Sequence, residues 1–179
     1  MIAATHPYAA NISRNAALAS AATGVPLLAL GRPAWEAQAG DCWREVEDVA
    51  AAVDALGTAP RRVFLALGRN EVRAFEAAPQ HAYVVRSVDP IAPPLAVPHA
   101  EYILARGPFS EADDRALLGA SGIEIIVAKN SGGTATYGKI AAARALGLEV
   151  VMLRRPQLPD VPRVSDADAA LAWLDAQCG

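Results

Sequence analysis

A polar, glycine-rich turn follows the apolar run at residues 123–128, and its residue types suit the binding of an anion. The turn reads Lys-Asn-Ser-Gly-Gly-Thr from Lys129 to Thr134, with a further hydroxyl at Thr136. Two glycines allow a backbone to approach a ligand closely, and the first N–H groups of the helix that follows are free to donate. The turn matches neither GxxxxGK[ST] nor GxGxxG. An ordinary capped turn needs only one glycine and one cap, so the pattern favours ligand contact.

Basic and polar side chains also follow the other expected strands. The carboxyl ends of parallel strands meet at one edge of a sheet, where open α/β sheets bind ligands. The residues expected at this edge, besides the turn, are Thr5, His6, Arg32, Arg69, Arg86, Arg106, Arg154 and Arg155. Any single arginine could be solvated surface, but the set fits bidentate pairing with a ligand that carries several carboxylates. His6 is either a proton donor or a hydrogen-bonded loop residue.

The elements that must position these residues alternate between strand-like and helix-like segments, which predicts an α/β fold with parallel sheets. Strands are expected at residues 26–31, 61–69, 82–88, 101–106, 123–128 and 149–155. Helices are expected at residues 13–22, 47–57, 110–120, 140–146 and 165–176, and the proline-rich segment 89–98 is expected to be a linker. Trp35, Trp43 and Trp173 are expected to pack rather than to stack on a ligand. The chain opens on what looks like the end of a strand, so the first layer of the fold is expected to be incomplete.

Composition sets broad limits on function. The chain has 179 residues, of which 53% are hydrophobic and 20% charged, and this is typical of a globular protein. A net charge of −3 without a basic stripe argues against a nucleic-acid partner. Cys42 and Cys178 have no metal-binding or redox spacing, so no metal site is expected. Without a signal peptide or an apolar run of about 18 residues, no membrane partner is expected and a cytoplasmic location is the default.

At this level of detail the sequence resembles the precorrin-6A reductases of cobalamin biosynthesis. The matching segments have the right order over nearly the whole chain and lie at residues 4–9, 32–35, 68–69, 88–90, 105–109, 129–139 and 155–156. They read ATHPYA, RPAW, GR, VDP, ARGPF, KNSGGTATYGK and RP. Two departures stand out: Ala3 occupies a position where the family has Asp, and the family's glycine-rich G-G-T segment upstream is absent.

The resemblance implies a Rossmann- or flavodoxin-like α/β architecture in two domains. The first, at residues 1–55, would be the shortened remainder of the cofactor-side domain, and the second, at residues 56–179, would be complete. The activity implied is NADPH-dependent reduction of a ring double bond, from precorrin-6A to precorrin-6B. The alternative is a non-catalytic module that binds a tetrapyrrole or a nucleotide. The oligomeric state stays open, with self-association through the incomplete layer as one outcome.

The resemblance also implies roles for the candidate site residues. His6 would be the catalytic proton donor, although solvent could supply the proton instead. The turn would contact NADPH or a substrate carboxylate through Lys129, Asn130, Ser131, Gly132, Gly133, Thr134 and Thr136. The peripheral carboxylates of an anionic precorrin would be bound by Thr5, Arg32, Arg69, Arg86, Arg106, Lys139 and Arg155.

Overall fold

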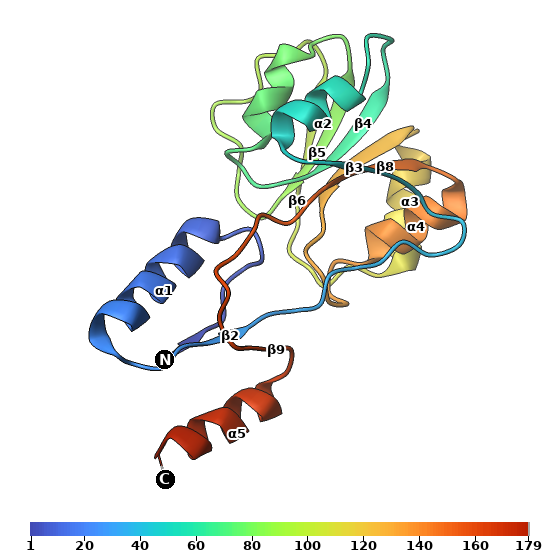
Figure 1. Cartoon of the computed structure of the whole chain (residues 1–179). Helices are drawn as coiled ribbons and strands as arrows, with labels where there is room; N and C mark the ends of the chain where they lie inside the picture. Colours follow the sequence, from blue (N-terminus) through green and yellow to red (C-terminus); the bar gives the residue numbers. More distant parts are fainter. Residues whose placement is uncertain (179) are drawn as a thin grey trace. The chain divides into compact units, whose positions relative to one another are not determined.

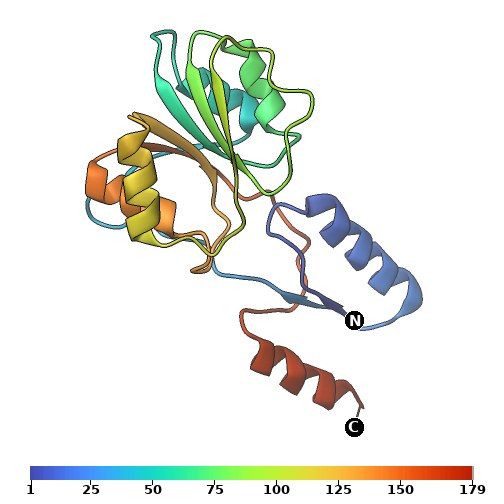
Figure 2. The same ribbon diagram turned by 180° about the vertical axis from the view of Figure 1, so that it is seen from behind.

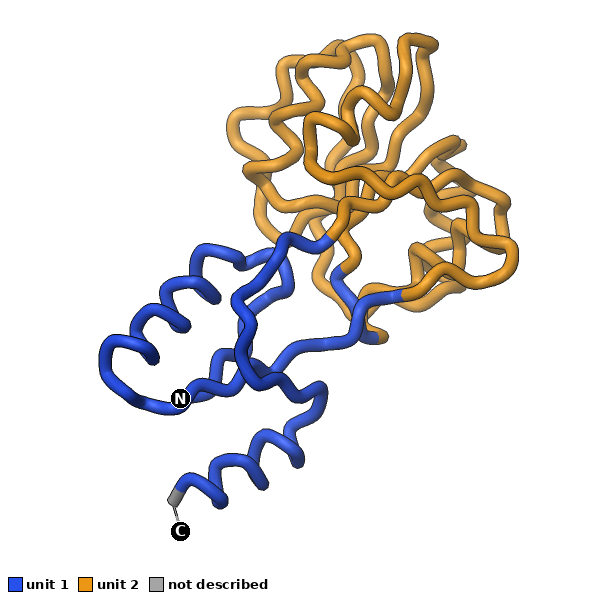
Figure 3. Tube along the Cα trace, viewed as in Figure 1, with its two compact units in different colours: residues 1–35, 131–133, 155–179 blue, residues 36–130, 134–154 orange. Residues whose placement is uncertain are grey.

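The computed structural model describes residues 1–178 and divides into two compact units. Unit 1 contains residues 1–35, 131–133 and 155–179, and unit 2 contains residues 36–130 and 134–154 (Figure 3). The chain therefore leaves unit 1 after Trp35 and returns to it twice.

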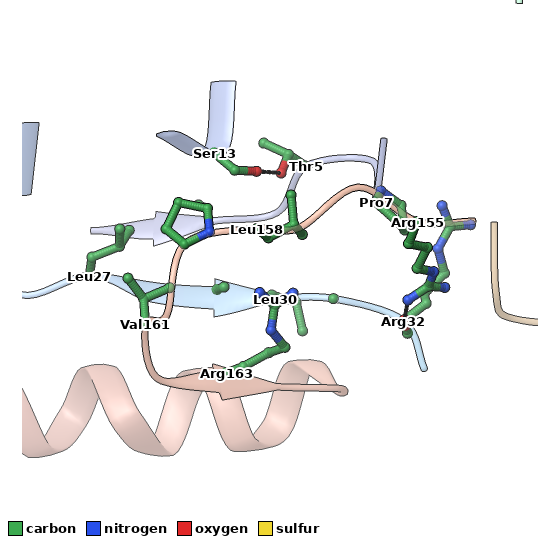
Figure 4. Close-up of a pocket in the computed structure, with 14 residues that line it drawn as sticks. Thr5, Pro7, Ser13, Leu27, Leu30, Arg32, Arg155, Leu158, Val161 and Arg163 are labelled. Atoms are coloured by element: carbon green, nitrogen blue, oxygen red, sulfur yellow. Dashed lines mark hydrogen bonds between the residues drawn. The ribbon is translucent and has the colours of Figure 1, made fainter. Parts of the chain in front are cut away.

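Unit 1 is built on a small parallel sheet with the strand order β1-β2-β9. Helices α1 and α5 lie on opposite sides of this sheet (Figures 1 and 4). Its elements are β1 (Ile2–Ala3), α1 (Ala10–Thr23), β2 (Leu28–Leu30), β9 (Arg163–Val164) and α5 (Ala167–Cys178). In the register of the sheet, Ala29 of β2 lies beside both Ala3 and Arg163. Helix α1 ends at Gly24, which adopts the left-handed conformation (φ 70°) and donates its N–H to the Ser20 carbonyl at 2.9 Å.

Unit 2 is a six-stranded parallel sheet with the order β3-β8-β7-β4-β5-β6. Two opposite views show α2 and η1 on one face and α3 and α4 on the other (Figures 1 and 2). Its strands are β3 (Cys42–Val46), β4 (Arg62–Ala66), β5 (Ala82–Ser87), β6 (Ala100–Leu104), β7 (Ile125–Lys129) and β8 (Glu149–Leu153). Its helices are α2 (Val49–Ala55), the 3₁₀ helix η1 (Val72–Ala77), α3 (Glu111–Ala120) and α4 (Gly138–Leu146).

The core of unit 2 lies along the central strands β4 and β7. Their consecutive side chains, from Val63 to Leu65 and from Ile125 to Val127, are at most 1% exposed. A parallel sheet that is covered on both faces requires such continuous apolar runs, because neither face of its strands meets water. These strands hold the residues at their carboxyl ends in fixed positions.

The structure confirms an α/β fold with parallel sheets. It also confirms the start of α3, where the Ser110 hydroxyl accepts a hydrogen bond from the Asp113 N–H at 3.1 Å. Three elements were not predicted: β3, η1 and β9. Among the described residues, no helix is both long and apolar enough to cross a membrane.

The division into units differs from the expected boundary between residues 55 and 56. Residues 36–55 belong to unit 2 because β3 pairs along its whole length with β8, from Cys42 beside Glu149 to Val46 beside Leu153. The C-terminal segment belongs to unit 1 because β9 pairs with β2. Both pairings join segments that are distant in sequence, so periodicity along the chain does not reveal them.

Candidate functional site

The residues expected at a single sheet edge belong to two different sheets. Thr5, His6, Arg32 and Arg155 are in unit 1, whereas the residues in unit 2 are Arg69, Arg86, Arg106, Lys129, Lys139 and Arg154. The expectation of one continuous edge was wrong, because β1 and β2 pair with each other and with β9 rather than with any strand of the six-stranded sheet. Each unit therefore has its own carboxyl edge.

The carboxyl edge of unit 1 has a hollow of about 370 Å³. Its lining residues lie at or just after the ends of β1, β2 and β9: Ala4, Thr5, Leu30, Gly31, Arg32, Ser165, Asp166 and Ala167. Such a volume is in the range of small-molecule sites, which extends from about 300 to 1,000 Å³. The Asp166 carboxylate caps α5 by accepting the Ala169 N–H at 2.8 Å. Thr5 and Arg32, both predicted site residues, lie together in this hollow.

A second, smaller cavity of about 30 Å³ lies beside the first (Figure 4). Leu27, Leu30, Leu158 and Val161 are among its apolar lining residues, and its polar side chains are those of Thr5, Ser13, Arg32, Arg155 and Arg163. The Thr5 and Ser13 hydroxyls are hydrogen-bonded at 3.1 Å. This cavity holds no more than a water molecule or two, so the larger hollow is the better candidate for a ligand site.

Arg155 ties together the backbone of this edge. Its guanidinium donates to the Arg32 carbonyl at 2.8 Å and to the Pro33 carbonyl at 3.1 Å. Burial lowers the pKa of Arg155, the positive charges of Arg32 and Arg163 lower it further, and Tyr8 opposes the shift. The predicted ligand contact at Arg155 is thus also a structural bridge that positions Arg32.

The two glycines of the turn allow a close approach of the protein's own chain. Gly132 and Gly133 have φ angles of 68° and 69°, which residues other than glycine rarely adopt. A Cβ at Gly132 would lie 2.1 Å from the Pro33 carbonyl oxygen and 2.4 Å from Nη2 of Arg155. The Gly133 carbonyl accepts a hydrogen bond from Trp35 Nε1 at 2.7 Å. Packing within unit 1 therefore accounts for the glycine pair, whereas the sequence pattern was interpreted as space for a ligand.

The rest of the turn lies at the carboxyl edge of unit 2, except for Ser131, which is half-buried in unit 1. Lys129 forms an ion pair with Glu71, whose carboxylate also accepts the Gly68 N–H at 2.8 Å. Asn130 is buried and donates its N–H to the Leu153 carbonyl at 3.4 Å.

Two threonines complete the turn in unit 2. The exposed Thr134 accepts the Tyr137 N–H at its carbonyl, at 3.1 Å. Thr136 accepts Lys139 Nζ at its carbonyl, at 2.6 Å, while its own hydroxyl is buried and has no hydrogen-bond partner among the described residues.

Arg86 and Lys139 are buried inside unit 2, at 8% and 4% exposure. Arg86 forms an ion pair with Asp114, and its guanidinium lies 3.8 Å from the centre of the Phe109 ring. Burial lowers the pKa of Lys139 to about 7, the nearby Arg86 charge lowers it too, and Asp114 opposes the shift. This placement favours a structural role for both side chains.

In contrast, Arg69 and Arg106 are exposed after β4 and β6, where they can meet a ligand.

His6 is exposed in the segment between β1 and α1, and its Nδ1 accepts the Tyr8 N–H at 3.3 Å.

The sequence did not point to Arg163 as a candidate site residue. It belongs to β9, a strand of only two residues, so no apolar run marks it in the sequence. Only the pairing of β9 with β2 brings its side chain to the edge that carries Arg32.

Comparison with known proteins identifies the family. Residues 1–175 match the family model described as Precorrin-6x reductase CbiJ/CobK. A precorrin-6A reductase of Sinorhizobium sp is 60% identical over 171 residues, which are 96% of this chain and 66% of that protein. A precorrin-6A reductase of Rhodobacter capsulatus is 49% identical over 174 residues, covering 97% of this chain and 69% of that protein.

A solved structure, CobK precorrin-6A reductase, superposes with a TM-score of 0.93 and 48% identity, covering 98% of this chain and 70% of the other. The chain thus spans about two thirds of the length of these relatives. The superposition covers 98% of this chain. This chain belongs to the precorrin-6x reductase family.

Proposed function

We propose that this chain acts in cobalamin biosynthesis, in the reduction of precorrin-6A to precorrin-6B with NADPH as the hydride donor. The observation that carries the proposal is the relative of Sinorhizobium sp, which bears the name precorrin-6A reductase and is 60% identical over 96% of this chain. The proposal includes a cytoplasmic location, which rests on the sequence alone.

The exposed guanidinium groups fit an anionic tetrapyrrole. A precorrin carries acetate and propionate side chains around its ring, and arginine is the residue best suited to bidentate pairing with carboxylates. Arg69 and Arg106 follow strands of the unit 2 sheet and are exposed, as is Arg32 at the edge of unit 1. In this proposal Arg69 and Arg106 bind peripheral carboxylates, and Arg32 binds either a carboxylate of the substrate or a phosphate of the cofactor.

The hollow in unit 1 fits part of a dinucleotide cofactor. It combines ligand-sized volume with a guanidinium at Arg32 and a hydroxyl at Thr5, which are groups that bind phosphate or ribose oxygens. The hydroxyls of Ser131 and Thr134 and the ammonium of Lys129 are further proposed contacts to the cofactor or to a substrate carboxylate. NADPH, when bound, supplies the hydride.

The chain's own residues then hold the reactants together and manage one proton. Reduction of a carbon–carbon double bond adds a hydride to one carbon and a proton to the other, while NADPH becomes NADP⁺. Placement of the two reactants accounts for most of such catalysis. His6, exposed after β1, is the proposed proton source, and its protonated ring would donate to the second carbon.

A turnover assay tests the proposal. NADPH oxidation by the purified chain is followed in the presence of precorrin-6A, with NADH in parallel and with the His6→Gln variant at several pH values. We expect oxidation that requires precorrin-6A and is faster with NADPH than with NADH. In the His6→Gln variant the rate should no longer depend on the protonation of an acidic group. Binding of both ligands without oxidation would instead support the non-catalytic binding module.

A further inference from the structure

Arg163 reaches from β9 to the carboxyl end of β2, the strand end that Gly31 and Arg32 follow. It is a β9 residue whose Cα pairs with Ala29, and its Nη1 lies 3.3 Å from the position of a Cβ on Gly31. Arg32 is the next residue after Gly31, and Arg155 holds the Arg32 carbonyl. Figure 4 shows Arg32 and Arg155 side by side, with Arg163 approaching the same strand end from β9.

Arg32 and Arg163 differ from most arginines of unit 2 in having no acidic partner in the part of the chain that the structure describes. Among the described residues, no carboxylate forms an ion pair with Arg32 or Arg163, and neither guanidinium donates a hydrogen bond. Most arginines of unit 2 differ in this respect, since carboxylate partners are found for Arg44, Arg61, Arg62, Arg73, Arg86, Arg144 and Arg154. Mutual repulsion is visible in the pKa of Arg155, which burial lowers and which the charges of Arg32 and Arg163 lower further.

An anion would relieve this repulsion. Asp166, the acidic residue in the adjoining hollow, already accepts the Ala169 N–H at the start of α5. The guanidinium groups of Arg32 and Arg163 have no hydrogen-bond or ion-pair partner among the described residues, and near the carboxyl end of one parallel strand they offer positive charge and N–H donors to a phosphate or carboxylate group. We infer that Arg163, together with Arg32 and with Arg155 behind it, forms an oxyanion-binding subsite for a phosphate or carboxylate of the ligand.

The ligand's identity rests on the proposed function, which offers two sources of the anion. NADPH carries a pyrophosphate and a 2′-phosphate, and the precorrin carries peripheral carboxylates. Arg163 contributes specificity in either case, because its guanidinium can form two parallel hydrogen bonds to one anionic group.

Calorimetric titration of the purified chain tests the subsite with three probes: NADPH, NADH and an octacarboxylate porphyrin. The variants are Arg163→Gln, which removes the charge, and Arg163→Lys, which keeps the charge but not the bidentate geometry. The matched control is Arg115→Gln, because Arg115 is exposed on α3 and its loss changes the net charge equally. We expect Arg163→Gln to weaken at least one probe by about 10- to 100-fold, Arg163→Lys to weaken it less, and the control to leave all three unchanged.

The pattern of losses identifies the anion. Weaker NADPH binding with unchanged NADH binding indicates the 2′-phosphate, equal losses for both indicate the pyrophosphate, and a loss confined to the porphyrin indicates a carboxylate. The melting temperature of Arg163→Gln should match or exceed that of the unsubstituted chain, because repulsion is relieved.

Two results would overturn the inference: affinities for all three probes equal to those of the control, or lower affinity together with a lower melting temperature, which would indicate a structural role. The proposed function is tested separately. Absence of NADPH oxidation by the unsubstituted chain would refute the reductase, but it would not alter the binding measurements.

Discussion

Substitution of Gly132 by alanine should destabilise unit 1, because the new Cβ would require a strained backbone and would clash with neighbouring groups. The left-handed backbone at φ 68° costs an L-residue about 1–2 kcal/mol. The new Cβ would also lie 2.1 Å from the Pro33 carbonyl oxygen and 2.4 Å from Arg155 Nη2, so these groups must separate. That movement breaks a hydrogen bond from a charged donor, now 3.1 Å long, which contributes about 1.5–3 kcal/mol. The expected total is a loss of about 2.5–5 kcal/mol in the free energy of unfolding.

Gly24→Ala is the matched control within unit 1. Gly24 has nearly the same φ, 70°, but a Cβ there would have nothing within 4 Å. Only the backbone cost of about 1–2 kcal/mol should remain. Urea unfolding of both variants and the unsubstituted chain gives the comparison, with tryptophan fluorescence and circular dichroism checked for coincident transitions. Equal losses for the two glycines would refute the account of Gly132, and so would a stable Gly132→Ala variant with weakened ligand binding.

Three further predictions concern unit 2. Burial lowers the pKa of His81, and Arg61 adds to the shift while Gly57 opposes it, so the folded state favours the neutral ring. The free energy of unfolding should therefore fall as the pH drops below 6.5, and urea titrations at several pH values should show a smaller fall for His81→Gln. The pKa of Lys139 is lowered to about 7, so above this pH the folded state binds fewer protons than the unfolded state. The free energy of unfolding should therefore rise as the pH increases from 7 toward 10.5, and Lys139→Met should lack this rise. Arg86→Met leaves the Asp114 carboxylate buried without its partner and should cost about 3–5 kcal/mol, whereas Arg86→Met with Asp114→Leu should recover most of that loss in thermal melts.

Local features of the fold could be predicted from the sequence because they depend on neighbouring residues. The Ser110 cap contacts a backbone N–H three residues away, and the buried strands β4 and β7 are continuous apolar runs. The short strands β3 and β9 could not be predicted in the same way. β9 has two residues and β3 is an edge strand with mostly exposed side chains, so neither has the apolar pattern that marks a strand.

The candidate site was predicted in part. Thr5 and Arg32 do line a ligand-sized hollow at a carboxyl edge, as the position of each after a strand indicated. Arg86 was predicted to be a ligand contact because it lies near the end of a strand, but Asp114 on α3 pairs with it. The pattern of one strand does not show which acid the following helix will bring beside it.

Motifs and periodicity along the chain are enough to identify the family, the α/β class and the residue types that gather after the strands. Which of those residues meet depends on the tertiary structure. The pairing of β9 with β2 placed Arg163 at the strand end that Arg32 follows, and the return of residues 131–133 to unit 1 placed Gly132 against Pro33 and Arg155. The physical reason is that strand pairing and close backbone packing join segments that are distant in sequence, and no local pattern encodes the partner of such a segment.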